Sequence, residues 1–237
     1  ADDVLIGGWV ETVDGSFEEP LAIATASNGT IWVLDSIRQW VYAFDETGDP
    51  LGKVGGPEAQ FYHPRSMNIF SQPDAEDIMV VANTGAGNLR LYGLDGTPLG
   101  TVGVFGDAPG RFNEPVDVLR DEFGAYFVTE GANINRWQRV DPFGKPLDAW
   151  PLDAPVAFDG SHLAWGPDGS IFMTNSDQGV LRRYGPDGLL LDEWRTIDTV
   201  TFERPVGIFA DVAHNRLFVS DVARGEVHIF RIEIEAE

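Results

Sequence analysis

A motif that recurs five times constrains the fold of this chain more than any other feature of its sequence. Four copies begin with Phe-x-x-Pro, at Phe17, Phe61, Phe112 and Phe202, and one begins at Phe158 without the proline. Each copy continues with an apolar run that ends in a polar residue, at intervals of 45 to 48 residues. These strand-end residues are Asp35, Asn83, Glu130, Asn175 and Asp221. A period of this length indicates one supersecondary unit per copy.

Each copy reads as four short strands. The second run is apolar at successive positions, which is typical of a strand that is covered on both faces. One such column consists of Trp32, Val80, Phe127, Phe172 and Phe218. A third and a fourth run follow, and in four copies a Gly-containing turn joins them, as expected for a hairpin. No segment has the pattern of a long, capped amphipathic helix, so we predict an all-β fold.

The arrangement of these units predicts a five-bladed β-propeller of four-stranded blades that forms a single domain over residues 1–237. We expect the blades at approximately 17–56, 61–105, 112–151, 158–195 and 202–232. The last copy ends before its fourth run, and Ile6-Gly7-Gly8-Trp9 aligns with the fourth runs that end at Trp150 and Trp194. We therefore expect an N-terminal strand at residues 4–10 to complete the last blade and close the ring, which leaves no free sheet edge.

The repeat resembles that of the NHL-repeat β-propellers. The first copy, residues 17–54, carries the Phe-x-x-Pro start, a turn, an apolar run that ends in Asp, and a run that ends in Phe-Asp-x-x-Gly. Many NHL propellers have six blades, so an incomplete six-bladed propeller is the alternative. The resemblance is specific for the fold and says little about function, because propellers carry unrelated activities on one scaffold.

Charge and composition exclude some partner classes. The chain carries 16 Lys plus Arg against 38 Asp plus Glu, a net charge of −22, which disfavours nucleic acid and anionic membrane surfaces as partners. Its longest apolar runs are too short to span a bilayer, so we expect no membrane insertion. The start Ala1-Asp2-Asp3, the absence of cysteine and the acidity fit an exported periplasmic or extracellular protein. An excised domain of a larger protein or complex would read the same way.

Two residues are candidates for catalysis and four for metal binding. The second residue after the proline position should face the central channel, and at this column only Asp117 and His162 can do acid–base or metal work. Carboxylate and amide oxygens at the strand ends would suit Ca²⁺ or another divalent ion. The metal candidates are Asp117, Glu130, Asn175 and Asp221. The alternative is that the strand-end residues bond the backbone of neighbouring turns, because all five copies carry one. The leading hypothesis requires no cofactor.

Three residues are candidates for binding a partner. Arg139 and Arg183 occupy the same column of successive third strands, and with Arg136 and Arg182 they form a basic spot on an acidic chain. Such arginines bind anionic groups through bidentate contacts, or else they pair with some of the many carboxylates of the chain itself. Trp40 precedes a third strand, where an exposed indole would stack on a sugar or anchor a partner protein.

These observations favour a non-catalytic scaffold that binds a protein segment or a glycan at a channel mouth. The repeats are regular, unique polar residues are few, and no complete catalytic set is evident. The first alternative is a metal-dependent hydrolase or lyase that resembles the propeller lactonases, with its site in the channel. The second alternative is a structural subunit of a larger assembly.

Overall fold

The computed structural model describes residues 11–72, 75–131, 134–152 and 159–233, and within them the fold is all-β. The only helical elements described are three single-turn 3-10 helices, η1 (Pro57–Ala59), η2 (Thr84–Ala86) and η3 (Val212–His214). Five antiparallel sheets follow one another along the chain as the blades of a β-propeller, so the predicted fold is confirmed. The chain divides into two compact units, residues 1–86 with 90–101 and residues 87–89 with 102–237, which are described separately.

The first unit contains blades 1 and 2. Blade 1 consists of β3 (Pro20–Thr25), β4 (Ile31–Asp35), β5 (Trp40–Phe44) and β6 (Pro50–Gly55). Blade 2 consists of β7 (Ser66–Gln72), β8 (Ala75–Asn83), β9 (Asn88–Gly93) and β10 (Pro98–Val102). A two-residue hairpin of β1 (Glu11–Thr12) and β2 (Gly15–Ser16) precedes them. The first strands of the two blades, β3 and β7, are in contact.

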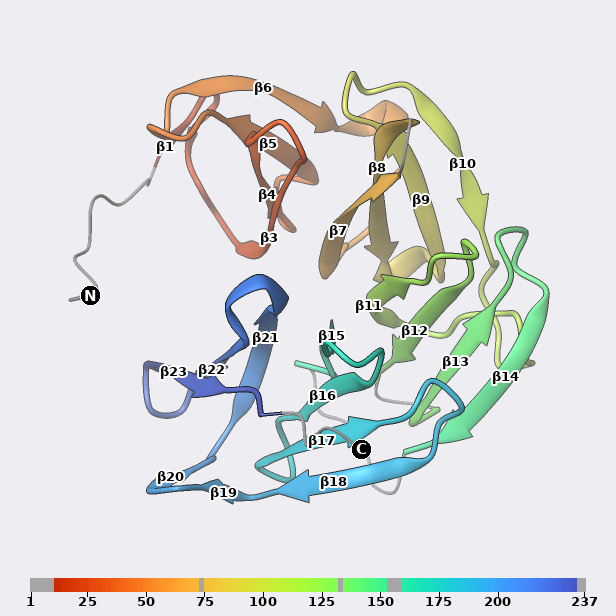
Figure 1. Cartoon of the computed structure of the whole chain (residues 1–237). Coiled ribbons are helices and arrows are strands. Elements are labelled where there is room, and N and C mark those ends of the chain that lie inside the picture. Colours follow the sequence, from red (N-terminus) through yellow and green to blue (C-terminus); the bar gives the residue numbers. More distant parts are fainter. Residues whose placement is uncertain (1–10, 73–74, 132–133, 153–158, 234–237) are drawn as a thin grey trace. The chain divides into compact units, whose positions relative to one another are not determined.

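The second unit contains blades 3, 4 and 5 (Figure 1). Blade 3 consists of β11 (Pro115–Arg120), β12 (Tyr126–Glu130), β13 (Arg136–Val140) and β14 (Pro146–Pro151). Blade 4 consists of β15 (Leu163–Trp165), β16 (Ile171–Asn175), β17 (Val180–Tyr184) and β18 (Leu190–Trp194). A short hairpin of β19 (Thr196–Ile197) and β20 (Val200–Thr201) leads to blade 5. The first strands are neighbours in space, since β11 contacts β15 and β15 contacts β21 of blade 5.

Blade 5 has three described strands, β21 (Pro205–Asp211), β22 (Arg216–Asp221) and β23 (Glu226–Arg231). The N-terminal strand that the sequence predicts for this blade, residues 4–10, lies outside the described residues, as does Phe158 at the predicted start of blade 4. Among the described residues no helix has the length and apolar character that crossing a membrane would require.

The core of each blade forms around its second strand. All five residues of β12 and all five of β16 are buried, as the continuous apolar pattern predicted. In blade 3 the Phe127 ring lies parallel to Trp150 at a centroid distance of 6.4 Å, with Trp137 fully buried beside it. Each large apolar side chain that is buried in this way contributes about 1.5–3 kcal/mol to the free energy of unfolding.

Candidate functional site

The strand-end aspartates hold the loop that precedes their own blade. The Asp35 carboxylate accepts hydrogen bonds from the backbone N–H groups of Glu18 at 2.7 Å and Glu19 at 3.2 Å. Asp221 accepts the N–H groups of Glu203 at 2.7 Å and Arg204 at 3.0 Å in the same way. Burial raises the pKa of Asp221, but the hydrogen bonds from these backbone N–H groups lower it by a larger amount. The pKa therefore lies below its ordinary value. Both aspartates are fully buried and have a structural role, because each holds backbone N–H groups of the preceding loop.

The strand-end asparagines are also bound to backbone. The Asn83 side-chain oxygen accepts the N–H of Tyr62 at 2.6 Å, and its amide group donates to the Gln60 carbonyl at 3.1 Å. The Asn175 oxygen accepts the N–H of Gln178 at 3.0 Å. The buried Asn175 amide nitrogen has no hydrogen-bond partner within the described part of the chain.

Glu130 is fully buried at the end of β12 and lies in a dense hydrogen-bond network. Its carboxylate accepts the Arg136 Nε–H at 2.5 Å, the Gln138 side-chain amide at 2.7 Å and the Asn113 backbone N–H at 2.7 Å. Burial raises the pKa of this carboxyl group, and the contacts with Arg136, Asn113 and Gln138 offset only part of the increase. Arg136 also donates to the Arg111 carbonyl at 2.9 Å, so the network holds the loop before blade 3.

Asp117 and His162 are brought together, and the carboxylate is bound to backbone. Asp117 follows a register shift in β11, is buried, and accepts the N–H groups of Val118 and Leu163, each at 2.8 Å. His162 Nδ1 lies 3.5 Å from Asp117 Oδ2, beyond a normal hydrogen bond. Asp117 therefore joins blade 3 to blade 4 through the Leu163 N–H, and the catalytic role of this pair stays a prediction.

A set of hydroxyl groups that the sequence analysis did not consider links the blades of the second unit. Thr129 Oγ1 accepts the Asp117 N–H at 3.2 Å and donates to the Ser161 carbonyl at 2.6 Å, in the next blade. Thr174 Oγ1 likewise accepts the His162 N–H at 3.1 Å and donates to the Val206 carbonyl of blade 5 at 2.7 Å. Ser220 of blade 5 accepts the Gly207 N–H at 2.9 Å. The signal is visible in the sequence, because a hydroxyl residue precedes the strand-end residue in blades 3 to 5, where blades 1 and 2 have Leu34 and Ala82.

No three His, Asp or Glu side chains among the described residues are grouped so that they could hold a metal ion. The metal candidates Asp117, Glu130, Asn175 and Asp221 each bind the backbone at their own place in the fold, as set out above. A bound ion at these residues stays a prediction that geometry does not favour.

Trp40, the first residue of β5, is half-buried. A Cβ atom on Gly56, which has a φ of 73°, would lie 2.3 Å from Cζ2 of the indole, so the ring lies directly against the Gly56 backbone. The Lys53 ammonium lies 4.1 Å from the ring centroid. Trp40 is thus packed within blade 1, and a role in partner binding stays a prediction.

Arg139 lies in a pocket of about 720 Å³ between blades 3 and 4. Its guanidinium group pairs with Asp121 at 2.6 Å and lies 5.3 Å from the centroid of the Phe127 ring. Phe123 and Trp165 also line this pocket, which we call the blade 3–4 pocket. The Trp165 indole donates to the Arg120 carbonyl at 3.2 Å, which fixes the wall that blade 4 contributes.

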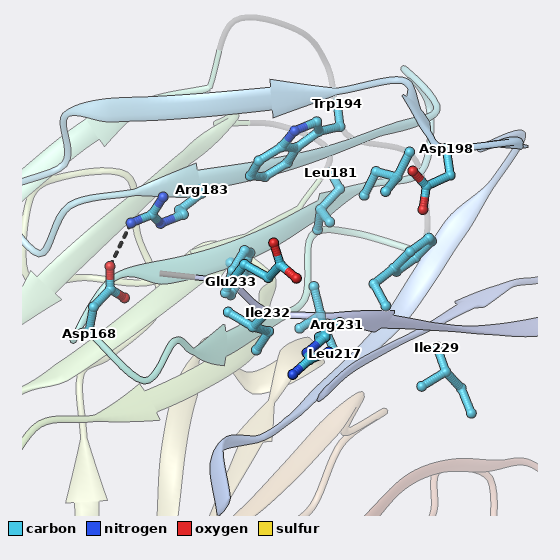
Figure 2. A pocket seen from close by; sticks show the side chains of 13 residues that line it. Asp168, Leu181, Arg183, Trp194, Asp198, Leu217, Ile229, Arg231, Ile232 and Glu233 are labelled. Atoms are coloured by element: carbon cyan, nitrogen blue, oxygen red, sulfur yellow. Dashed lines mark hydrogen bonds and ion pairs between the residues drawn. The ribbon is translucent and has the colours of Figure 1, made fainter. Parts of the chain in front are cut away.

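Arg183 lines a second pocket, of about 460 Å³, between blades 4 and 5. Its guanidinium group binds Asp168 at 2.6 Å, Asp192 at 2.9 Å and the Ser170 hydroxyl at 3.1 Å. Figure 2 shows the Arg183–Asp168 pair at one end of the pocket, with Asp198 at the other. Apolar side chains also line the pocket. They include Phe172, Leu181, Trp194, Ile197 and Leu217. The two arginines of one sequence column therefore lie in separate pockets.

No family model matches the sequence, and no curated protein matches it. Solved structures do match. Virginiamycin B lyase from Staphylococcus aureus is 17% identical over 92% of this chain and 71% of that chain, with a TM-score of 0.60. A Bacteroides caccae protein of unknown function is 13% identical over 90% of this chain and 78% of that chain, with a TM-score of 0.68. Hydrazine synthase from Kuenenia stuttgartiensis is 13% identical over 90% of this chain and 64% of that chain, with a TM-score of 0.63.

At these identities the similarity concerns the fold alone. The neighbours include a lyase and a protein of unknown function on similar scaffolds, so the fold does not select an activity. The β-propeller is shown by the sheets themselves, and membership of the NHL family stays a resemblance of the repeat pattern.

Proposed function

We propose that this chain is a non-catalytic binding propeller that takes a segment of a partner protein on its second unit. The observation that carries the proposal is the contrast between its polar interior and its surface pockets. Of the two titratable residues that the sequence offers for catalysis, Asp117 binds the backbone N–H groups of Val118 and Leu163, and His162 lies beside the same carboxylate. The blade 3–4 pocket instead offers aromatic and charged side chains that line an open space.

The pocket has the character of a binding site. A volume of about 720 Å³ fits a few amino-acid side chains. Exposed Phe123 and half-buried Trp165 supply aromatic surface, which dominates the affinity of protein interfaces. Arg139 is positioned by Asp121, so little of its side-chain entropy remains to be lost when a partner binds.

The experiment is a selection of ligands by the immobilised protein, with a phage-displayed peptide library in one arm and a glycan array in the other. Enrichment of peptides that Trp165→Ala weakens supports the proposal, and Trp194→Ala serves as the matched variant in the neighbouring pocket. Binding of glycans alone contradicts the choice of a protein segment. Turnover of lactone or ester substrates that a chelator abolishes contradicts the non-catalytic role and favours the hydrolase.

A further inference from the structure

The turn between β11 and β12 differs in chemistry from the equivalent turn of blade 4. Phe123 occupies the position of Asp168 and is 78% exposed. Asp121, two residues earlier, accepts the N–H groups of Phe123 at 3.0 Å and Ala125 at 2.8 Å. The turn is thus stabilised without the side chain of residue 123. A phenylalanine there adds nothing to the turn and leaves a large apolar surface in water.

A second exposed phenylalanine on blade 3 provides a matched reference. Phe143 lies in the turn between β13 and β14 and is 93% exposed. Asp141 accepts the N–H groups of Phe143 and Lys145, each at 2.9 Å, so this turn is built like the first. Phe123 lines the blade 3–4 pocket, whereas Phe143 is not among its lining residues. The two side chains therefore share exposure and local geometry and differ in their access to the pocket.

The charges in the pocket determine whether it favours a positively or a negatively charged ligand. The carboxylate of Asp121 neutralises Arg139, and Arg120 supplies one further positive charge. Three more acidic side chains line the pocket and form no ion pair with any described residue. They are Glu122, Asp148 and Asp187. The lining is therefore net negative on a chain of net charge −22, so it attracts a cation and repels an anion.

From these observations we propose that the blade 3–4 pocket binds a lysine or arginine side chain, next to an apolar residue, in an extended segment of the partner protein. This inference rests on the binding role proposed above and adds the chemistry of the partner. The ammonium or guanidinium group meets the unpaired carboxylates and the exposed face of Phe123. The apolar neighbour packs on the aromatic surface of Phe123 and Trp165. A neutral glycan would stack on the aromatic rings and donate hydroxyl hydrogen bonds to the carboxylates, but it would leave their negative charge uncompensated.

The test uses the phage-displayed peptide library as the probe, followed by calorimetric titration of the enriched peptides. We expect peptides in which Lys or Arg stands within two residues of an aromatic or aliphatic residue. Phe123→Asp, which copies the blade 4 turn, should raise the Kd about tenfold or more. The double variant Asp148→Asn with Asp187→Asn should raise the Kd of the enriched peptides roughly several-fold, as expected for the loss of exposed charges. It should also make the Kd less dependent on salt concentration. Phe143→Asp should leave the Kd within about twofold, as expected for a residue outside the contact.

The outcomes separate this inference from the proposed function. Enriched peptides that are acidic, or that lose no affinity in Phe123→Asp, overturn the inference while a binding role for the propeller stands. Equal losses in Phe123→Asp and Phe143→Asp also overturn it, because they show that the loss does not depend on access to the pocket. If no peptide is enriched by the folded protein, the proposed function itself fails. Thermal unfolding of each variant checks that the fold is intact.

Discussion

Blades 3 and 4 place an arginine at the same position of their third strands and hold it differently. In blade 4, Arg183 binds two carboxylates and a hydroxyl group, from Asp168, Asp192 and Ser170. In blade 3, Arg139 binds the single carboxylate of Asp121, although Asp148 lies opposite it on β14 as Asp192 lies opposite Arg183 on β18. Arg183 therefore pairs with the carboxylate opposite it, Asp192, whereas Arg139 forms no ion pair with the carboxylate opposite it, Asp148.

The cause of this difference is three residues in a turn. Blade 4 has Gly166, Asp168 and Ser170 where blade 3 has Asp121, Phe123 and Ala125. In blade 4, Asp168 and Ser170 supply an ion-pair partner and a hydroxyl acceptor, whereas in blade 3 Asp121 alone of the three binds the arginine. A position in a repeat therefore predicts where a side chain stands, while the turn beside it decides whether that side chain stabilises the fold or remains available to a ligand.

The largest difference in stability should come from the strand ends, where blade 3 has an ion pair and blade 4 has Asn175. Arg136→Met leaves the fully buried Glu130 carboxylate without its cation and should cost about 3–5 kcal/mol of unfolding free energy. Urea unfolding measures this cost. Arg136→Met with Glu130→Gln should recover part of it, because the amide carries no charge. A loss below about 1 kcal/mol in the single variant would show that the pair is not needed.

The hydroxyl bridges join the same backbone positions in both blades and should therefore give similar results. Thr129→Val leaves a buried N–H and a buried carbonyl unpaired, and Thr174→Val leaves a partly buried N–H and carbonyl unpaired, each at a cost of about 1–3 kcal/mol. Thr129→Ser and Thr174→Ser keep the hydroxyl group and should cost less. Unfolding free energies that differ between the two blades by more than about 1 kcal/mol would contradict the equivalence of the bridges.

The two arginines should differ on a smaller scale. Arg183→Met removes three contacts from a partly exposed side chain and should cost about 1 kcal/mol, after allowance for solvent screening. Arg139→Met removes one ion pair and should cost less than about 0.5 kcal/mol. Chemical unfolding of the two variants side by side measures the difference. An equal or larger loss for Arg139→Met would reverse the comparison.

The smallest effect is a dependence on pH. Burial raises the pKa of Asp168, but the hydrogen bonds from the Ser170 hydroxyl and Arg183 lower it by a larger amount. The net result is a pKa of about 2 in place of the ordinary 3.8. Because the folded-state pKa is depressed, the stability that this carboxylate contributes is present above pH 3.8 and is lost as the pH falls through about 2. The difference in unfolding free energy between the wild type and Asp168→Asn should therefore shrink across this window. A difference that stays constant down to pH 2 would show that the ionised group contributes nothing.

The sequence alone predicted the five blades, because the apolar columns of β4, β8, β12, β16 and β22 repeat in register and each must be covered on both faces. It also identified Arg139 and Arg183 as equivalent. It did not identify Phe123, because a phenylalanine in a turn reads like many other apolar residues until the turn's hydrogen bonds are seen to need only Asp121. The backbone roles of Asp117 and Glu130 also depend on N–H groups far along the chain, which composition and spacing do not locate.

The most direct measurement replaces Phe123, and in a second variant Phe143, with the photo-crosslinking residue p-benzoylphenylalanine and irradiates each in the presence of an enriched lysine-containing peptide. The account predicts a covalent adduct at position 123 that excess unlabelled peptide suppresses, and little or none at position 143. Adducts of equal yield at both positions, or at 143 alone, would contradict the claim that the blade 3–4 pocket is the binding site.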